Sequence, residues 1–153
     1  MKFFTSILML TSLLFSYEKG DLISNDISTH LNLKADKVYV INFFASWCRS
    51  CKKELPLVSK VNSQINKDQI EIIGIDVDKD VNKGIAFQKH LKENGKLNFR
   101  IINDPQSLII SEFNPKGMPT LFYIKNNKVL KVTTGAVPDI DENILLSLKG
   151  MCK

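Results

Sequence analysis

The chain has 153 residues, of which 44% are hydrophobic and 24% are charged, so it can bury the core of one domain and hardly of two. Its formal net charge is +5, and the basic residues are scattered rather than gathered in a stripe, which argues against a nucleic-acid partner. Three cysteines are too few for a disulfide scaffold, and their odd number leaves at least one without an internal partner.

The N-terminal stretch MKFFTSILMLTSLLFS predicts a signal peptide. Lys2 precedes an apolar run over residues 3–15, and Ser16 is a small residue suited to the last position before cleavage. The run is shorter than the roughly 20 apolar residues that a membrane-spanning helix needs. We therefore expect residues 1–16 to be a signal peptide, with an uncleaved N-terminal anchor as the alternative. The folded domain is expected over residues 20–150, in the periplasm or elsewhere outside the cytoplasm.

The first strand and helix of this domain follow from its apolar pattern. The run KVYVINFF (37–44) is rich in β-branched and aromatic residues and predicts a strand that is covered on both faces. From Arg49 onward, apolar residues recur at helical spacing as far as Ile65. Pro56 is expected to bend this helix, because it lacks an N–H donor.

Two further pairs of strand and helix follow. Residues 70–78 predict a strand, and residues 80–95 predict a helix that stops at Gly95. Residues 97–104 predict the next strand. A short helix can begin at Asp104-Pro105, and the sequence NPKGMP breaks it.

The C-terminal part predicts a β-hairpin and a last helix. The hairpin covers residues 120–135 and turns at Asn126-Asn127, because asparagine tolerates positive φ. The helix begins at Pro138 or Asp139 and ends at Gly150. The order β-α-β-α-β-α-β-β-α predicts an α/β fold with a central mixed β-sheet flanked by helices on both faces.

Two of the cysteines lie three residues apart, where the predicted first strand is followed directly by its helix. Open α/β sheets place their reactive sites at this end of a central strand. Cys48 would face the positive end of the helix dipole, which favours the thiolate and predicts a nucleophile. Cys51 lies one helical turn deeper and can attack a mixed disulfide at Cys48, so it is the expected resolving thiol.

Other uses of the two cysteines fit the sequence less well. A zinc site would need two more ligands, and His30, His90 and Cys152 form no second pair, so we expect no metal site and no cofactor. A copper carrier remains an alternative function, although no His or Met stands near enough to complete a site. A peroxidase would need Pro and Thr ahead of the first cysteine, and FFASW has neither. Cys152 is expected to be a frayed terminal thiol or an intermolecular bridge, and the two histidines are expected at the surface.

The stretches VINFFASWCRSCKKELP and GMPTLFYI resemble the thioredoxin superfamily, and within it the secreted TlpA/ResA-like thiol-disulfide oxidoreductases. The resemblance covers roughly residues 20–150. It rests on Trp47, the C-x-x-C motif, Pro56 and the tetrapeptide 117–120. It implies a thioredoxin fold and an enzyme that exchanges its disulfide with cysteines of protein substrates. A membrane or periplasmic thiol protein would supply the electrons.

The resemblance also assigns roles to single residues. It implies that Pro119 follows a cis peptide bond and faces the dithiol, and that the backbone of Met118 pairs with the polypeptide substrate. Glu54 corresponds to an acid near the site in the secreted branch. Three positions beyond Cys51, it could face that sulfur and raise its pKa. The alternative is a solvated helix carboxylate.

Four positions around the dithiol are expected to tune it or to meet the substrate. Asn42 stands where cytosolic thioredoxins carry a buried acid, and an amide cannot accept a proton in the same way. Arg49 adds positive charge beside Cys48, which favours the dithiol and hence an oxidant, and Ser50 replaces a common proline. The resemblance favours a reductant instead, as in cytochrome c maturation, so a disulfide-forming oxidant remains the alternative. Trp47 either fills the edge of the core or shields the sulfur and contacts the substrate.

Overall fold

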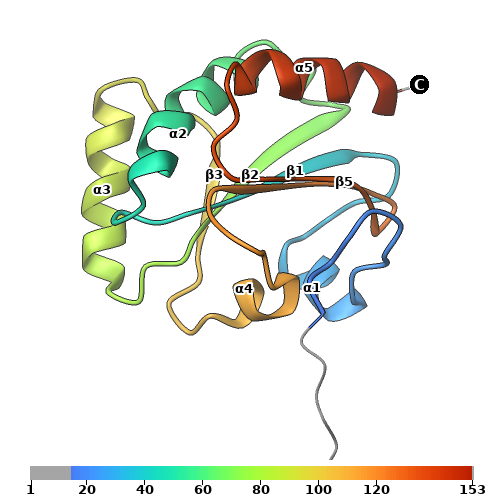
Figure 1. The fold of residues 1–153 in the computed structure, drawn as a ribbon, viewed down its shortest axis with the longest axis horizontal. Helices are drawn as coiled ribbons and strands as arrows, with labels where there is room; N and C mark the ends of the chain where they lie inside the picture. Colours follow the sequence, from blue (N-terminus) through green and yellow to red (C-terminus); the bar gives the residue numbers. More distant parts are fainter. Residues whose placement is uncertain (1–14, 153) are drawn as a thin grey trace, which may run out of the picture.

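The computed structural model describes residues 15–152, so the predicted signal peptide lies almost wholly outside the described residues. A five-stranded sheet in the order β3-β2-β1-β4-β5 forms the centre, with helices on both faces (Figure 1). The strands are β1 (Val38–Phe44), β2 (Ile70–Asp76), β3 (Arg100–Asn103), β4 (Thr120–Lys125) and β5 (Lys128–Thr134). The helices are α1 (Asn25–His30), α2 (Arg49–Asn62), α3 (Val81–Glu93), α4 (Leu108–Phe113) and α5 (Ile140–Met151).

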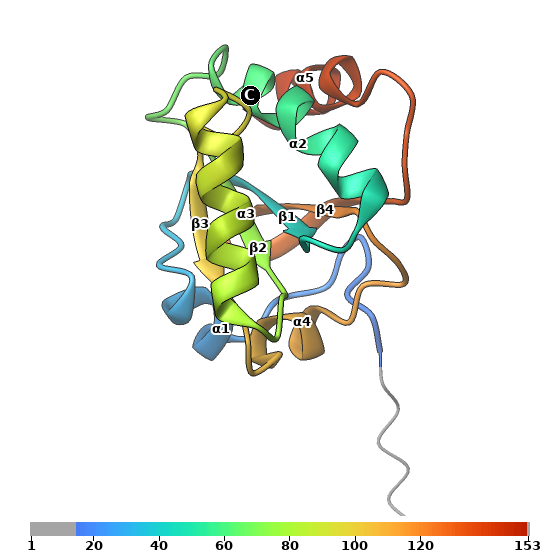
Figure 2. The ribbon, with the colours of Figure 1, turned by 90° about the vertical axis from the view of Figure 1, so that its left-hand side faces the viewer.

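The sheet is mixed, which confirms the predicted fold class. Strands β1, β2 and β3 are parallel, while β4 runs antiparallel to both β1 and β5. The crossovers through α2 and α3 step across the sheet in the same direction, and right-handed connections therefore place both helices on one face. Helix α5 joins them there, and α1 and α4 cover the opposite face (Figures 1 and 2).

Strand β1 is buried at every position because both of its faces are covered. On the α4 face, the ring of Phe43 lies 5.3 Å from that of Phe113 and 5.8 Å from that of Phe122. On the other face, Phe44 packs against Phe87 of α3, with ring centroids 6.3 Å apart. Such aromatic pairs bury large apolar areas. The continuous apolar run of the sequence is thus a strand with no solvent-facing side.

Helix α3 ends where the sequence predicted. Its last residue is Glu93, and Gly95 follows with a φ of 66°. The backbone N–H groups of Gly95 and Lys96 donate to the carbonyls of Lys92 and Leu91, respectively. These two bonds satisfy carbonyls that the helix end would leave free, and the left-handed backbone they require favours glycine.

Several element bounds differ from the prediction, among them the end of β2, which lies at Asp76 and not at residue 78. Helix α2 ends at Asn62 rather than near Ile65. Strand β3 is shorter than the predicted 97–104. Helix α4 begins at Leu108 and not at Asp104-Pro105, because the buried Asp104 carboxylate accepts the N–H of Leu108 at 2.8 Å and a second one two residues later. This acid therefore fixes the start of the helix from a position four residues before it.

The last two strands and the last helix agree with the sequence. Strands β4 and β5 are joined at Asn126 and Asn127, whose φ values of 51° and 60° are positive as expected for this turn. Asp139 is the N-cap of α5. The helix ends at Met151, one residue after the predicted Gly150.

The region before β1 holds structure that the sequence analysis did not predict. Helix α1 is only 6 residues long and begins after Ser24, whose hydroxyl accepts the N–H of Ile27 at 3.3 Å. Residues 20–23 run beside β5 and exchange backbone hydrogen bonds with residues 127–129. They therefore cover the outer edge of β5 at its start.

Gly74, in the middle of β2, lies at a tightly packed position of the sheet. A Cβ at this position would lie 2.5 Å from Ile101 Cδ1, 2.8 Å from a ring carbon of Phe44 and 3.0 Å from a ring carbon of Phe99. We expect Gly74→Ala to lower the free energy of unfolding by about 1–3 kcal/mol through overpacking. Gly150→Ala is the control, because a Cβ there meets nothing within 4 Å and should be neutral or stabilising. Urea denaturation measures both, and equal effects at the two positions would contradict the packing seen here.

Candidate functional site

The site lies in the four residues that connect the buried strand β1 to helix α2. Cys48 is the N-cap of this 14-residue helix, with an extended backbone (φ −82°, ψ 103°). Its Sγ accepts the N–H of Cys51 at 3.3 Å, and its own N–H donates to the carbonyl of Ala45 at 3.1 Å. The first sulfur thus lies against unsatisfied N–H groups and the positive end of the helix dipole, an environment that stabilises a thiolate.

The two sulfurs of the C-x-x-C motif are bonded to each other and differ in exposure. Cys48 and Cys51 form a disulfide with their Cα atoms 5.3 Å apart. Cys48 is 7% exposed and Cys51 is 1% exposed. The neighbouring Trp47 is 68% exposed, so its ring does not fill the core edge. An incoming thiol or disulfide therefore meets Cys48 first, beside an exposed indole.

The predicted substrate-binding turn lies at the same edge of the sheet. The Met118-Pro119 peptide bond is cis. Thr120 pairs with Phe43 in the antiparallel register of β1 and β4, so Pro119 stands where β1 leads into the cysteine turn. The carbonyl of Pro119 accepts the N–H of Gly135 at 2.8 Å. Met118 is half-buried.

A buried carboxyl group lies between α2 and β1. Glu54 is 6% exposed, and its Oε1 accepts a hydrogen bond at 2.9 Å from Nδ2 of Asn42, which is 1% exposed. Burial raises the pKa of Glu54 to about 7, and the hydrogen bond from Asn42 opposes this only in part. The alternative of a solvated helix carboxylate is therefore wrong. The residues of this turn that face solvent are Lys52 and Lys53.

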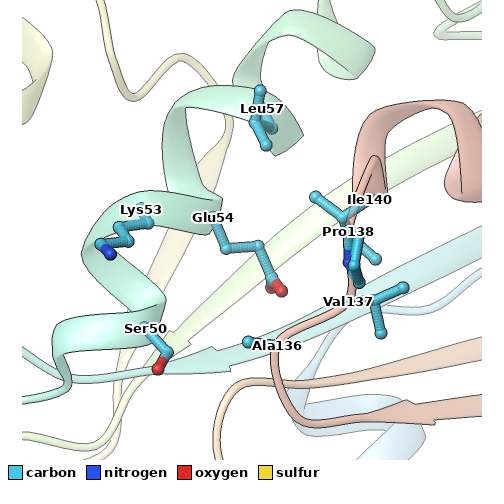
Figure 3. A pocket seen from close by; sticks show the side chains of 8 residues that line it. All are labelled: Ser50, Lys53, Glu54, Leu57, Ala136, Val137, Pro138 and Ile140. Carbon is cyan, nitrogen blue, oxygen red and sulfur yellow. The ribbon is translucent and has the colours of Figure 1, made fainter.

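Glu54 faces a pocket of about 330 Å³ between α2 and the segment that leads into α5 (Figure 3). In Figure 3 the carboxyl group points into this space, while the ammonium group of Lys53 points away from it. Ser50, from between the two cysteines, also lines the pocket. The remaining walls are apolar and come from Leu57, Ala136, Val137, Pro138 and Ile140. The sequence did not predict this pocket, because its two sides are about eighty residues apart in the chain.

The sequence analysis also missed two residues that support the cysteine turn. Ser46 donates two hydrogen bonds to the carboxylate of Asp78. The sequence pattern that could have indicated this is IDVD, which places acids at the carboxyl end of β2 beside the end of β1.

The remaining candidates lie away from the disulfide or in solvent. Arg49 is exposed. Cys152 is half-buried against the core, and its N–H donates to the carbonyl of Leu148 at 3.2 Å, so the interpretation as a frayed thiol is wrong. His30 and His90 are exposed, as predicted. Within residues 15–152, no three His, Cys, Asp or Glu side chains come together in a group that could hold a metal ion.

Comparison with known sequences gives one family and a set of named relatives. The model of the thioredoxin-like family matches residues 36–129. The thiol-disulfide oxidoreductase ResA of Geobacillus kaustophilus is 28% identical over 134 residues, which is 84% of this chain and 75% of that protein. The ResA protein of Bacillus subtilis is 29% identical over 109 residues, 71% of this chain but only 58% of that protein. The chain thus spans less than two thirds of the Bacillus subtilis relative.

Solved structures show the same fold. A candidate thiol:disulfide interchange protein DsbE from Chlorobium tepidum superposes with a TM-score of 0.75 at 23% identity, covering 90% of this chain and all of that one. StoA from Bacillus subtilis superposes with a TM-score of 0.64 at 22% identity, covering 80% of this chain and 87% of that one. The predicted thioredoxin fold is therefore confirmed.

The raised pKa of Glu54 predicts a pH-dependent stability. In the unfolded chain the carboxyl group titrates near 4.5, and in the folded protein near 7. The native state therefore binds more protons than the unfolded state between these values, so the contribution of Glu54 to stability is complete below pH 4.5 and is lost as the pH rises through 7. We expect Glu54→Gln to be more stable than wild type at pH 8 by up to about 3 kcal/mol and to lose this advantage at pH 5.

Urea denaturation of the oxidised proteins at several pH values between 5 and 8 measures this difference. Glutamine keeps an oxygen that can accept the hydrogen bond of Asn42, and all other acids are common to both proteins. A stability difference that stays constant across this range would show that Glu54 is ionised in the folded protein throughout.

Proposed function

The chain belongs to the thioredoxin-like family, and we propose that it is a thiol-disulfide oxidoreductase that exchanges its Cys48–Cys51 disulfide with cysteines of other proteins outside the cytoplasm. The superfamily resemblance noted in the sequence is thereby confirmed. The observation that carries the proposed activity is the placement of this disulfide at the start of α2, with one sulfur capping the helix and the other buried behind it. The names of the ResA relatives give the same activity for those proteins.

The exchange proceeds in two steps when the protein acts as a reductant. The Cys48 thiolate attacks one sulfur of a substrate disulfide, the substrate S–S bond breaks, and a mixed disulfide forms while one substrate thiolate leaves. Cys51 then loses its proton and attacks Cys48 Sγ, which closes the enzyme disulfide and releases the second substrate thiolate. The substrate gains two electrons and two protons, and the enzyme dithiol becomes a disulfide. Reversal of these steps would oxidise the partner.

Glu54 is suited to control the second step. It is buried on α2 three residues beyond Cys51, and its pKa of about 7 leaves it partly ionised near neutral pH. In its ionised form it would oppose a thiolate on Cys51 by like-charge repulsion. It also offers a carboxylate that can accept the proton of this thiol when the mixed disulfide forms. Asn42 holds the carboxyl group for this role.

Two features near Cys48, one exposed and one partly buried, would meet the substrate. Trp47 offers apolar contact beside the sulfur. The turn at Met118 and Pro119 can hold an extended polypeptide by β-type hydrogen bonds with little demand on its sequence. Substrates are therefore expected to be cysteine-containing proteins, and no cofactor takes part in the exchange.

We assign the protein the reducing direction, as one step of cytochrome c maturation, with a membrane or periplasmic thiol protein as the electron donor. The resemblance of the sequence to the secreted TlpA/ResA-like branch favours the reducing direction, and the predicted signal peptide supports a place outside the cytoplasm. In residues 15–152, no helix is both long enough and apolar enough to span a membrane. The charge of Arg49 favours the dithiol form and so acts in the opposite sense, but Arg49 is exposed, and solvent screens its charge.

Cys51→Ala should trap covalent complexes with protein substrates in the native host. Without the resolving thiol, the mixed disulfide at Cys48 persists, and non-reducing electrophoresis with mass spectrometry identifies the partner. Cys48→Ala should trap much less, and a Cys152→Ala background removes the remaining thiol as a source of adducts. The assigned roles are wrong if the Cys51 variant traps nothing and keeps full turnover. A copper carrier is favoured instead if the reduced protein binds Cu(I) tightly through both thiols and shows no turnover.

The reduction potential of the Cys48–Cys51 couple decides between reductant and oxidant. We expect equilibration with glutathione to place it below about −200 mV, whereas a strong oxidant of this superfamily lies near −120 mV. Arg49→Gln removes a charge that favours the dithiol form and should lower the potential by no more than about 30 mV, because the side chain is exposed. A wild-type value near that of the strong oxidant would reverse the assigned direction.

A further inference from the structure

A group of buried polar side chains lies at the carboxyl end of β2, outside the groups that take part in the exchange. Asp76 is 1% exposed, Asp78 is 6% exposed, and Gln88 from α3 is 6% exposed. Among the ion pairs of residues 15–152, none includes either of these two acids. A buried carboxylate is unfavourable unless hydrogen bonds compensate for the lost water. The groups that form hydrogen bonds with these two acids therefore indicate the role of the acids.

Both oxygens of Asp78 are bound to a single residue of the cysteine turn. The backbone N–H of Ser46 donates to Oδ2 at 2.7 Å, and its hydroxyl donates to Oδ1 at 2.8 Å. Hydrogen bonds to an ionised acceptor are stronger than neutral ones. Ser46 stands two residues before Cys48, so Asp78 holds the chain just ahead of the nucleophile.

Asp78 is linked through its own backbone to Asp76, a buried acid of β2 that α3 contacts. Its backbone N–H donates to Asp76 Oδ1 at 2.9 Å. Gln88 Nε2 of α3 donates to Asp76 Oδ2 at 2.7 Å and to Asn103 Oδ1 of β3 at 2.6 Å. Helix α3 comes close at this point, because a Cβ on Gly84 would lie only 2.7 Å from Asp76 Oδ2. The acid that holds the turn is thus part of a rigid block made of β2, β3 and α3.

The turn between Ser46 and Cys48 carries the two groups that meet a partner. Its far end is fixed by the helix start and by the disulfide. Its near end is fixed by Asp78. Trp47 lies between these two points with its side chain 68% exposed. The direction of the indole and of Cys48 Sγ therefore depends on how firmly Ser46 is held.

We propose that Asp78 is a positioning residue of the disulfide exchange: by holding Ser46 it fixes Trp47 and Cys48 Sγ in the orientation that meets a protein disulfide. Asp78 touches neither sulfur nor substrate in this role. The proposal deepens the oxidoreductase function and rests on it. A purely structural role for Asp78 would instead change the stability of the domain and leave the motion of the turn unaltered.

The chain offers a matched set of variants. Asp78→Ala removes both hydrogen bonds to Ser46. Asp78→Asn keeps the shape, because its amide oxygen can accept the backbone N–H and its amide nitrogen can donate to the hydroxyl oxygen. Ser46→Ala removes only the hydroxyl. Asp104→Ala is the control, since Asp104 is an equally buried acid (4% exposed) whose carboxylate caps α4 and not the cysteine turn.

Two measurements report on the turn and on its use. Trp47 is the single tryptophan of the chain, so time-resolved fluorescence anisotropy of the folded protein follows this turn alone. The second is the rate at which the reduced protein reacts with a peptide carrying a Cys-x-x-Cys disulfide, divided by its rate with oxidised glutathione. We expect Asp78→Ala to increase fast motion of the indole and to lower this ratio about tenfold, with Asp78→Asn and Asp104→Ala within about twofold of wild type.

The proposal is overturned if the indole of Asp78→Ala moves as in wild type, or if Asp104→Ala lowers the ratio as much. Failure of Asp78→Asn to restore the wild-type behaviour would also overturn it. If Asp78→Ala does not fold, Ser46→Ala is measured in its place. An indole that moves in Ser46→Ala as it does in wild type would then overturn the proposal. A wild-type protein that reacts with neither disulfide would refute the oxidoreductase function, while the anisotropy would still decide whether Asp78 holds the turn.

Discussion

The whole site depends on the short connection between a fully buried strand and a helix. Because β1 is covered on both faces, its end cannot shift without disturbing the centre of the sheet. Helix α2 must then begin within four residues, and this makes Cys48 its N-cap. The position that favours an ionised sulfur is therefore set by the apolar packing of Phe43 and Phe44.

Two buried acids, Glu54 of α2 and Asp78 after β2, lie near this connection, and their carboxyl groups receive different hydrogen bonds. Glu54 receives a single hydrogen bond from an amide, so burial dominates and its pKa rises to about 7. Asp78 receives two hydrogen bonds from Ser46, a backbone N–H on one oxygen and a hydroxyl on the other. The first acid can change its charge near neutral pH and is suited to proton transfer. The second is suited to holding backbone in place.

The sequence predicted those features that arise from local pattern. The apolar run of β1, the turn at Asn126-Asn127 and the stop at Gly95 each depend on neighbouring residues, and all three are present. Helix α1 was missed because its six polar-rich residues have no apolar period to detect. The dithiol and the proline turn were found through motifs. The family resemblance indicated that Glu54 lies near the site, but its burial depends on Asn42 and on a segment more than eighty residues away.

The burial of Asp78 was beyond prediction for a related reason. Its partner Ser46 lies 32 residues earlier, and its support comes from α3 through Gln88 and from β3 through Asn103. The pattern IDVD places acids at the end of β2, but it does not separate an enclosed acid from a solvated one. Only the assembled sheet, with three elements meeting at the end of β2, shows which carboxylates are enclosed.

The pairing of residues 20–23 with β5 has a consequence for how this protein handles other chains. An uncovered sheet edge invites extended polypeptides, including further copies of the same protein, to stack onto it. Here residues 20–23 occupy the start of the β5 edge through hydrogen bonds to residues 127–129, and the opposite edge strand, β3, is only 4 residues long. The sheet edges left uncovered are therefore short, and the backbone contact proposed for a cysteine-containing substrate lies instead at the turn of Met118 and Pro119, at the same end of the sheet as the disulfide.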